Sequence, residues 1–186
     1  YLFPPYKLFS SSGLAECIPS KQTLASLVDN SKIVLTGTAS GHKWVTTSSQ
    51  IETHTKITID KILRGTYDND EIIVKWNAGS SVSEKFDTDE KYLLFLSEHD
   101  ENGVYGGFST CAGRKYTVTL GDSGEELVPY FASDIENGIE KEIDCPGGTA
   151  PTAIVEDTTG EKTEVKPAPC VRKYVLLKDL IKQIQR

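Results

Sequence analysis

The side chains best suited to catalysis or metal binding are scattered along this sequence. Its three histidines, His42, His54 and His99, fall in three separate segments, and none has a partner at metal-ligand spacing. The sequence has no Gly-x-Ser-x-Gly elbow and no Gly-rich phosphate loop before a helix. We therefore expect surface histidines, no catalytic residue, no metal site and no cofactor. The chain is predicted not to be an enzyme, and a metal-dependent hydrolase ranks last among the functions considered.

The cysteines are even in number and widely spaced, at Cys17, Cys111, Cys145 and Cys170. They contain no Cys-x-x-Cys pair, and this pattern favours two structural disulfides, for which three pairings are possible. Disulfides persist outside the reducing cytosol. The sequence contains no Met and begins at Tyr1, which favours removal of a secretory signal peptide over a shortened sequence. We expect a secreted, extracellular protein.

Composition and charge argue against two classes of partner. The chain has 186 residues, of which 38% are hydrophobic and 25% are charged, so it can bury a core. No apolar run reaches the roughly 18–20 residues of a membrane-spanning helix. The net charge is −7, with Lys and Arg dispersed among the acids, which argues against a nucleic acid held by phosphate contacts.

Aromatic and acidic residues give two further ligand signals. Trp44, Trp76, Tyr92 and Tyr105 suggest a stacking platform for single-stranded nucleic acid or sugar. The negative charge opposes a polyanion and leaves a neutral carbohydrate open. Acidic clusters at 68–71, 87–90 and 98–102 could bind calcium, yet none has the spacing of the twelve-residue calcium loop. We favour solvated turns, with calcium as the cofactor left open.

The N-terminal extension is apolar and aromatic. Pro4-Pro5 excludes a helix and favours an extended conformation. Exposed large apolar side chains mark contact sites, so the segment is expected either to lie across its own domain or to add to a neighbouring copy as a strand. We predict the second, a contact between copies. The residues assigned to it are Tyr1, Leu2, Phe3, Tyr6, Leu8 and Phe9.

The elements that position these residues are predicted to be mainly strands. A short helix over 20–30 is capped by Ser20, and a polar loop begins near Gly41. A register shift at Ile62-Leu63 indicates a bulge, and Asn102-Gly103 predicts a type I′ hairpin turn. Five to six antiparallel strands with closely spaced turn signals are typical of a small barrel or sandwich. The strands expected are 32–39, 51–63, 71–76, 91–96, 104–111 and 115–120.

The chain changes character after Gly121. Residues 129–138 are acidic and weakly helical in pattern. Two alternating arms around 158–160 predict a second hairpin, which a disulfide at its base would brace. An amphipathic C-terminal helix is predicted to pack on the barrel. Its apolar stripe consists of Leu177, Leu180, Ile181 and Ile184.

The pattern from Cys17 to Leu120 resembles the netrin-like domain, the OB-fold of the tissue inhibitors of metalloproteinases. The segments that match are AECIPS, SKIVLTGTA, KILRG, EIIVKW, DTDEKYLLFL and GFSTCAGRKYTV. The resemblance implies an OB-like barrel of five to six antiparallel strands and a Cys17–Cys111 disulfide, which leaves Cys145–Cys170. It divides the chain into an extension (1–16), a barrel (17–120) and a C-terminal extension (121–186).

One departure from this family bears on function. Its inhibitors chelate the zinc of the metalloproteinase through a cysteine at the first mature residue. Here the first residue is Tyr1, and sixteen residues precede Cys17, so this activity does not carry over. We therefore predict a secreted, non-enzymatic protein-interaction module that is structural or self-assembling through Tyr1–Ser12. The alternatives are a netrin-like inhibitor and a module that binds protein or carbohydrate.

Overall fold

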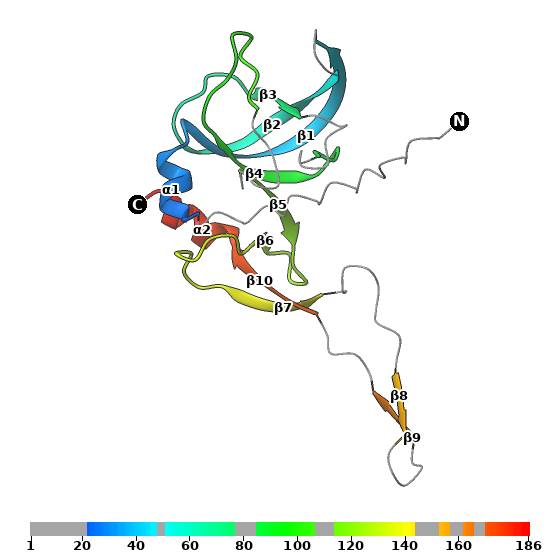
Figure 1. Ribbon diagram of the computed structural model, residues 1–186. Coiled ribbons are helices and arrows are strands. Elements are labelled where there is room, and N and C mark those ends of the chain that lie inside the picture. Colours follow the sequence, from blue (N-terminus) through cyan, green and yellow to red (C-terminus); the bar gives the residue numbers. More distant parts are fainter. Residues whose placement is uncertain are drawn as a thin grey trace, which may run out of the picture.

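One antiparallel sheet of eight strands dominates the fold, with two helices beside it (Figure 1). The computed structural model describes residues 22–47, 51–76, 85–106, 114–143, 153–156, 162–165 and 170–186. The strand order is β3-β2-β1-β4-β5-β6-β10-β7, which confirms the prediction of a mainly β, antiparallel fold. The elements are α1 (Leu24–Asp29), β1 (Ile33–Thr46), β2 (Ile51–Arg64), β3 (Glu71–Trp76), β4 (Lys91–Leu96), β5 (Lys115–Leu120), β6 (Glu126–Pro129), β7 (Ile139–Ile143), β8 (Ala153–Glu156), β9 (Lys162–Val165), β10 (Cys170–Leu176) and α2 (Leu177–Ile184).

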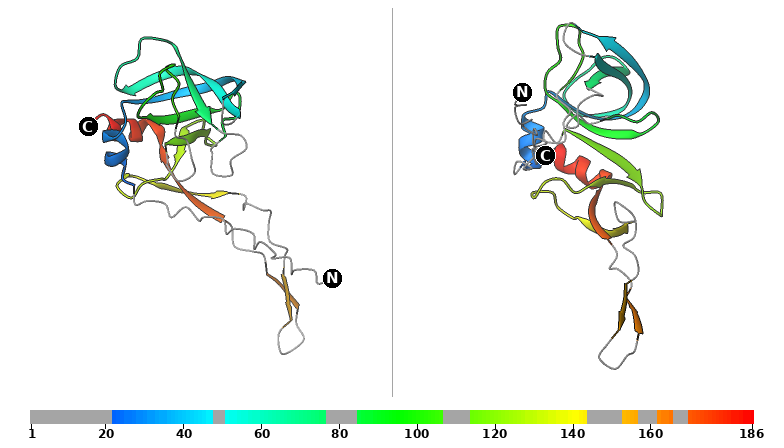
Figure 2. Two further views of the ribbon diagram at one scale, coloured as in Figure 1. Left: turned by 45° about the horizontal axis from the view of Figure 1, so that its top comes forward. Right: turned by 45° about the vertical axis from the view of Figure 1, so that its right-hand side comes forward.

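The described strands form an open sheet, with β3 and β7 at its edges, rather than a closed barrel. Strands β1, β2 and β3 curl strongly (Figure 2). Tyr105 lies across the edge of this curled part, through a parallel bridge to Val74 and an antiparallel bridge to His99. Its backbone accepts a hydrogen bond from the Lys75 N–H (2.7 Å) and donates one to the Ile73 carbonyl (3.0 Å).

The pairing of β1 with β2 is longer than the sequence predicted. The predicted bulge is confirmed, because Val34 pairs with Arg64 and Leu35 pairs with Ile62, which skips one residue of β2. The polar loop predicted from Gly41 is wrong. Strand β1 continues to Thr46 because the first residues of β2 pair with it up to Ile51.

Two hydrophobic cores lie on the two faces of β1 and β4. Tyr92, Leu94 and Leu96 of β4 enter the inner core, which β1–β4 and Tyr105 enclose. Leu93 and Phe95 enter the outer core, which the two helices, β5, β6 and β10 cover. Burial on both faces explains why β4 reads as a continuous apolar run, as expected for a strand in the middle of a sheet.

The two helices cover the outer core. Helix α1 begins at Leu24 with Thr23 as its N-cap, whose hydroxyl accepts a hydrogen bond from the Ser26 N–H (3.0 Å). The predicted cap, Ser20, lies outside the described residues. Helix α2 is confirmed, and Leu177, Leu180 and Ile184 of its predicted stripe are buried while Ile181 is partly buried.

The C-terminal third adds strands β6, β10 and β7 to the same sheet. The helical pattern predicted over 129–138 is wrong. Tyr130 donates its backbone N–H to Lys173 of β10 (2.9 Å), and Asn137 has a φ of 60°, which a right-handed helix does not allow. The predicted second strand pair is confirmed as β8 and β9, which lie apart from the large sheet (Figures 1 and 2).

The turn after β4 differs in type from the prediction. Gly103 has a φ of 75°, whereas Asn102 keeps a negative φ, so the turn is not type I′. The Gly103 N–H donates to the Asp100 carbonyl (3.0 Å), as in a type I turn followed by a left-handed glycine. The Asp100 carboxylate stabilises it by accepting hydrogen bonds from the N–H groups of Asn102 (2.9 Å) and Val104 (3.1 Å).

Candidate functional site

The inner face of the curled strands ends in a cluster of aromatic side chains, which we call the aromatic end. The register of β1, β2 and β3 brings these residues to one end of the sheet. Thr53 of β2 pairs with Trp44 of β1 on one side and with Trp76 of β3 on the other. One rung further in, His42 pairs with Thr55, and Thr55 pairs with Val74 of the inner core. Cross-strand partners lie on the same face of a sheet. The aromatic end consists of His42, Trp44, Ile51, Thr53, Thr55 and Trp76.

The Thr55 hydroxyl organises this cluster. It accepts a hydrogen bond from Nε1 of Trp76 (2.9 Å) and shares a second with Nδ1 of His42 (2.8 Å). The two rings meet edge to face, with centroids 6.3 Å apart and planes at 84°. Thr53 and Thr55 are both buried, so these hydrogen bonds fix the orientation of Trp76 and His42 from below.

The two tryptophans of the predicted platform come together, but its two tyrosines do not. Trp44 is 78% exposed and Ile51 is 58% exposed. Tyr92 and Tyr105 are buried in the inner core, where Tyr92 packs edge to face on Phe86 (5.1 Å). Sequence reasoning missed Thr55, although threonines at 53 and 55 among the apolar positions of a strand were a signal of polar groups on the inner face.

The opposite face of β2 and β3 carries an ion-pair network. Lys75 lies 2.8 Å from Asp100 and 3.8 Å from Glu52, and His54 lies 3.3 Å from the same Glu52 oxygen. The Lys75 hydrogen bond, assisted by the backbone N–H of Val104, lowers the pKa of Asp100 to about 2. The Asp100 hydrogen bond in turn raises the pKa of Lys75. The network ties the turn after β4 to the edge strand β3, which is a structural role.

The three histidines do not form a metal site. His42 and His54 lie on opposite faces of the curled strands, and His99 packs edge to face on Tyr105 (5.4 Å). In the described part of the chain, no group of three or more His, Cys, Asp or Glu could hold a metal ion. Several acids of the acidic clusters are paired with lysines, among them Glu71 with Lys56 (2.9 Å), Asp87 with Lys85 (2.6 Å) and Asp100 with Lys75 (2.8 Å).

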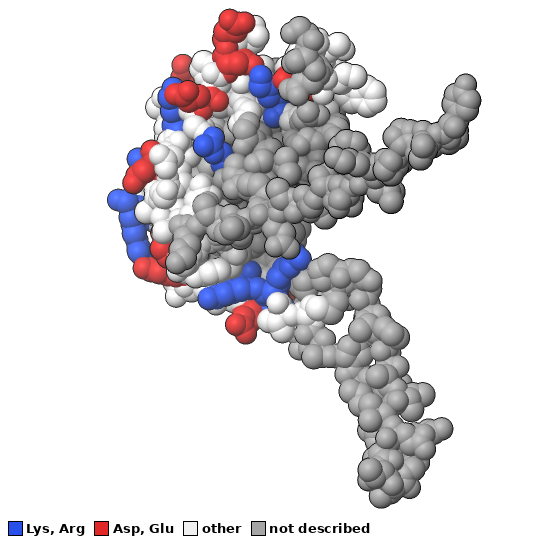
Figure 3. Space-filling view, viewed as in Figure 1, with Lys and Arg blue, Asp and Glu red and all other residues white. Residues whose placement is uncertain are grey.

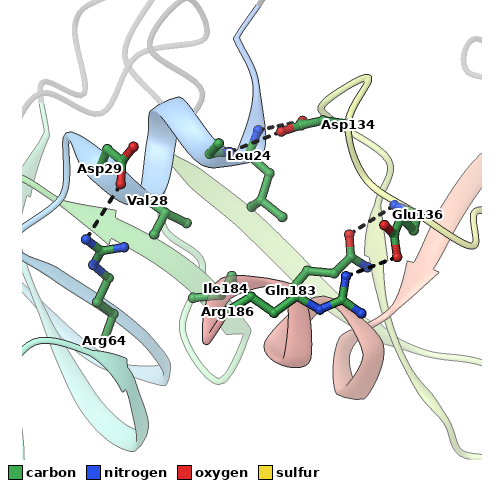
Figure 4. A pocket seen from close by; sticks show the side chains of 10 residues that line it. Leu24, Val28, Asp29, Arg64, Asp134, Glu136, Gln183, Ile184 and Arg186 are labelled. Atoms are coloured by element: carbon green, nitrogen blue, oxygen red, sulfur yellow. Dashed lines mark hydrogen bonds and ion pairs between the residues drawn. The ribbon is translucent and has the colours of Figure 1, made fainter.

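A pocket of about 300 Å³ lies between α1, α2 and the loop before β7 (Figure 4). The Asp134 carboxylate accepts hydrogen bonds from the backbone N–H groups of Leu24 (2.7 Å) and Ala25 (3.1 Å). Glu136 pairs with Arg186 (3.4 Å), and Arg64 pairs with Asp29 (3.6 Å). The hydrogen bonds of Asp134 hold the loop before β7 to helix α1. The other charged side chains that line the pocket pair with one another, so they offer little to a ligand.

The two edges of the sheet end differently. Tyr105 covers the edge of β3, as described above. Strand β7 pairs with β10 on one side, and no other described strand or bridge pairs with its outer side. Ile139 of β7 is 36% exposed and Val171 of β10 is 56% exposed. An open strand edge presents unpaired N–H and C=O groups, which makes it a pairing site for another segment.

The predicted contact and disulfide residues fall almost wholly outside the described part of the chain. Tyr1, Leu2, Phe3, Tyr6, Leu8, Phe9, Cys17, Cys111 and Cys145 all lie outside it. Cys170, the first residue of β10, is described and is not a free thiol. The pairings Cys17–Cys111 and Cys145–Cys170 therefore stay predictions.

Comparison of the sequence with protein-family models and with curated proteins finds no match. None of the described helices has the length and apolar character needed to cross a membrane. Acidic and basic side chains are interspersed over most of the described part of the face shown in Figure 3, and a row of basic side chains lies along its lower edge, near β7 and β10.

Proposed function

We propose that this chain is a secreted, non-enzymatic protein-interaction module that assembles with other copies of itself. In this proposal the Tyr1–Ser12 segment of one copy adds as a strand to the open edge of β7 in the next. The observation that carries the proposal is the difference between the two sheet edges, because only β3 is covered by a described residue. Such a contact joins two different surfaces, so it propagates into rings or filaments.

Strand β7 has the sequence IEKEI, with two glutamates and one lysine. Like charges opposite one another destabilise a strand pair, and opposite charges stabilise it. In Tyr1–Ser12 the one Lys, Arg, Asp or Glu is Lys7, which is complementary to the two glutamates. An apolar, weakly basic strand therefore suits the charge of this edge.

The finer features of the fold belong to the same proposal. Strands β1–β3 with β4 paired to β1, and Tyr105 parallel to β3, support an OB-like barrel that is partly open. The predicted disulfide Cys145–Cys170 would brace the β8–β9 hairpin. The family resemblance also leaves a netrin-like inhibitor as the alternative, but Tyr1 in place of a first cysteine argues against inhibition of metalloproteinases.

Deletion of Tyr1–Ser12 tests the proposed assembly. We expect the full chain to sediment as oligomers and the deleted chain as a folded monomer, because the donor strand is lost. The double substitution Phe3→Ser and Phe9→Ser should act in the same way. If these variants unfold instead, the segment belongs to the chain's own core and the proposal fails.

A mixing experiment tests whether the segment binds the body of the next copy. Deleted chains keep the β7 edge, so adding them in small amounts should shorten the full-length assemblies. If the segments bound only one another, deleted chains would not affect assembly size. A photoreactive benzoyl-phenylalanine at position 9 should form cross-links to residues 139–143 of an isotope-labelled copy.

A further inference from the structure

We propose that the aromatic end, formed by His42, Trp44, Ile51, Thr53, Thr55 and Trp76, is a binding site for a neutral saccharide. This site lies on β1–β3, while the proposed assembly surface is β7 at the other edge of the sheet. The two proposals rest on different residues and can fail separately.

Trp44 presents a large aromatic side chain to solvent. A large aromatic side chain that is 78% exposed, beside an Ile51 that is 58% exposed, leaves apolar surface in water. Exposed apolar patches of this kind mark binding sites. The backbone of Trp44 is held in the β1–β2 ladder opposite Thr53, so the indole projects from a rigid strand. The sheet therefore fixes the position of the Trp44 backbone before a ligand arrives.

The two indoles lie in one row across the strands. Trp44, Thr53 and Trp76 stand opposite one another on three adjacent strands. Two strand spacings separate the tryptophan backbones by about 10 Å. The Trp76 ring is held by its hydrogen bond to Thr55 (2.9 Å) and is partly exposed. Two aromatic side chains at this separation can contact two different rings of one oligosaccharide through their apolar C–H faces.

The imidazole of His42 provides a polar group beside the indoles. His42 is exposed, and its Nδ1 is engaged by Thr55 (2.8 Å). Its Nε2 has no hydrogen-bonding partner among the described residues, so it can bond to a ligand hydroxyl. A small number of directed polar groups beside an apolar surface is the usual composition of a small-molecule site.

The charge of the site selects the class of ligand. None of its six residues is Lys, Arg, Asp or Glu, and Lys43 and Lys75 alternate onto the opposite face. The charge of Asp87, which interacts electrostatically with His42, is balanced by its ion pair with Lys85 (2.6 Å). A polyanion would need cationic groups here, and a cationic ligand would need carboxylates. A ligand with apolar ring faces and neutral hydroxyl groups matches an uncharged surface of two indoles, one imidazole and two threonines. A neutral saccharide has this chemistry.

Tryptophan fluorescence tests the inference directly. The chain has two tryptophans, and both are in this site, so emission excited selectively from tryptophan reports on it alone. The full chain would be titrated with neutral hexasaccharides of β-1,4-glucose, β-1,4-N-acetylglucosamine, β-1,4-xylose and β-1,3-glucose. We expect at least one to shift the emission and protect Trp44 from acrylamide quenching. A sulfated hexasaccharide should do neither.

Matched variants separate the site from the fold. Trp44→Ala should weaken binding at least tenfold in calorimetry, and Trp44→Phe should weaken it less because a ring remains. Leu120→Ala removes a side chain that is 74% exposed at a different place and should leave binding unchanged. The inference is overturned if none of the four sugars binds, or if Trp44→Ala binds as tightly as the original chain. Loss of self-assembly in Trp44→Ala would instead identify the surface as a protein interface and also overturn it.

Discussion

The two ends of the eight-stranded sheet follow the same antiparallel pairing and finish in opposite ways. At the β3 end the strands curl around the inner core, and Tyr105 covers the last edge. At the β7 end no described strand pairs with the outer side of β7, and Ile139 and Val171 are exposed. Curling satisfies a sheet edge within one chain, whereas an open edge leaves N–H and C=O groups available to a partner. We propose small-ligand binding at the first end and assembly at the second.

Cavities in the two cores should have the largest effects. Leu93→Ala opens the outer core and Leu94→Ala opens the inner core, and both side chains are fully buried. Each should lower the free energy of unfolding by about 2.5–5 kcal/mol, measured by urea denaturation. Leu120→Ala, at an exposed position of β5, should change it by less than about 0.5 kcal/mol. Separate transitions for the two cores would show that the ends of the sheet fold independently.

Gly65 gives the next largest expected effect. Its φ is 83°, and a Cβ there would lie 2.2 Å from the Lys32 carbonyl oxygen. Gly65→Ala should therefore cost about 2–4 kcal/mol, from backbone strain and from the displaced backbone.

The matched control is Gly124→Ala in the β5–β6 turn. Gly124 has a similar φ of 79°, but nothing lies within 4 Å of its Cβ position. It should cost about 1 kcal/mol, from strain alone. If the two variants lose equal stability, the close contact of Gly65, after β2, with Lys32, before β1, does not restrict the curl of strands β1–β3.

The Lys75–Asp100 pair gives the smallest expected effect, through pH. The pKa of Asp100 is about 2, below its usual 3.8, so its ionised form is favoured by folding. This contribution is present above about pH 4 and is lost as the pH falls toward 2. Both side chains are 30% exposed, so it should be less than about 1 kcal/mol. Asp100→Asn should reduce the loss of unfolding free energy between about pH 4 and pH 2, measured by urea denaturation. If the variant loses stability over this range as steeply as the original chain, the assignment to Asp100 is contradicted.

Local sequence signals predicted most strands, because alternation and apolar runs are local. The bulge near Leu63, the strand 91–96 and the C-terminal apolar stripe all followed from periodicity. Errors arose where a distant partner decided the structure. Strand β1 passes Gly41 because β2 pairs with it, and 129–138 is not helical because β10 takes its backbone hydrogen bonds.

The aromatic end could be predicted only in part. Its two tryptophans stand out in the sequence, but their meeting depends on the register of three strands. Thr55 could not be assigned a role without that register, because its hydrogen bonds join residues 13 and 21 positions away. Tyr92 and Tyr105 looked equivalent to the tryptophans in composition, and only the inner core distinguishes them.

Strand β4 contributes side chains to both cores, because alternate residues of its backbone face opposite sides of the sheet. Leu93 and Phe95 face one core, while Tyr92, Leu94 and Leu96 face the other, and β4 is paired with β1 and β5 on its two sides. An opening that exposes the β4 amides to solvent must therefore disrupt both cores at once. In native-state hydrogen exchange these amides are expected to be among the slowest in the chain and to exchange only by global unfolding. The chain then behaves as one cooperative unit, although it carries two cores.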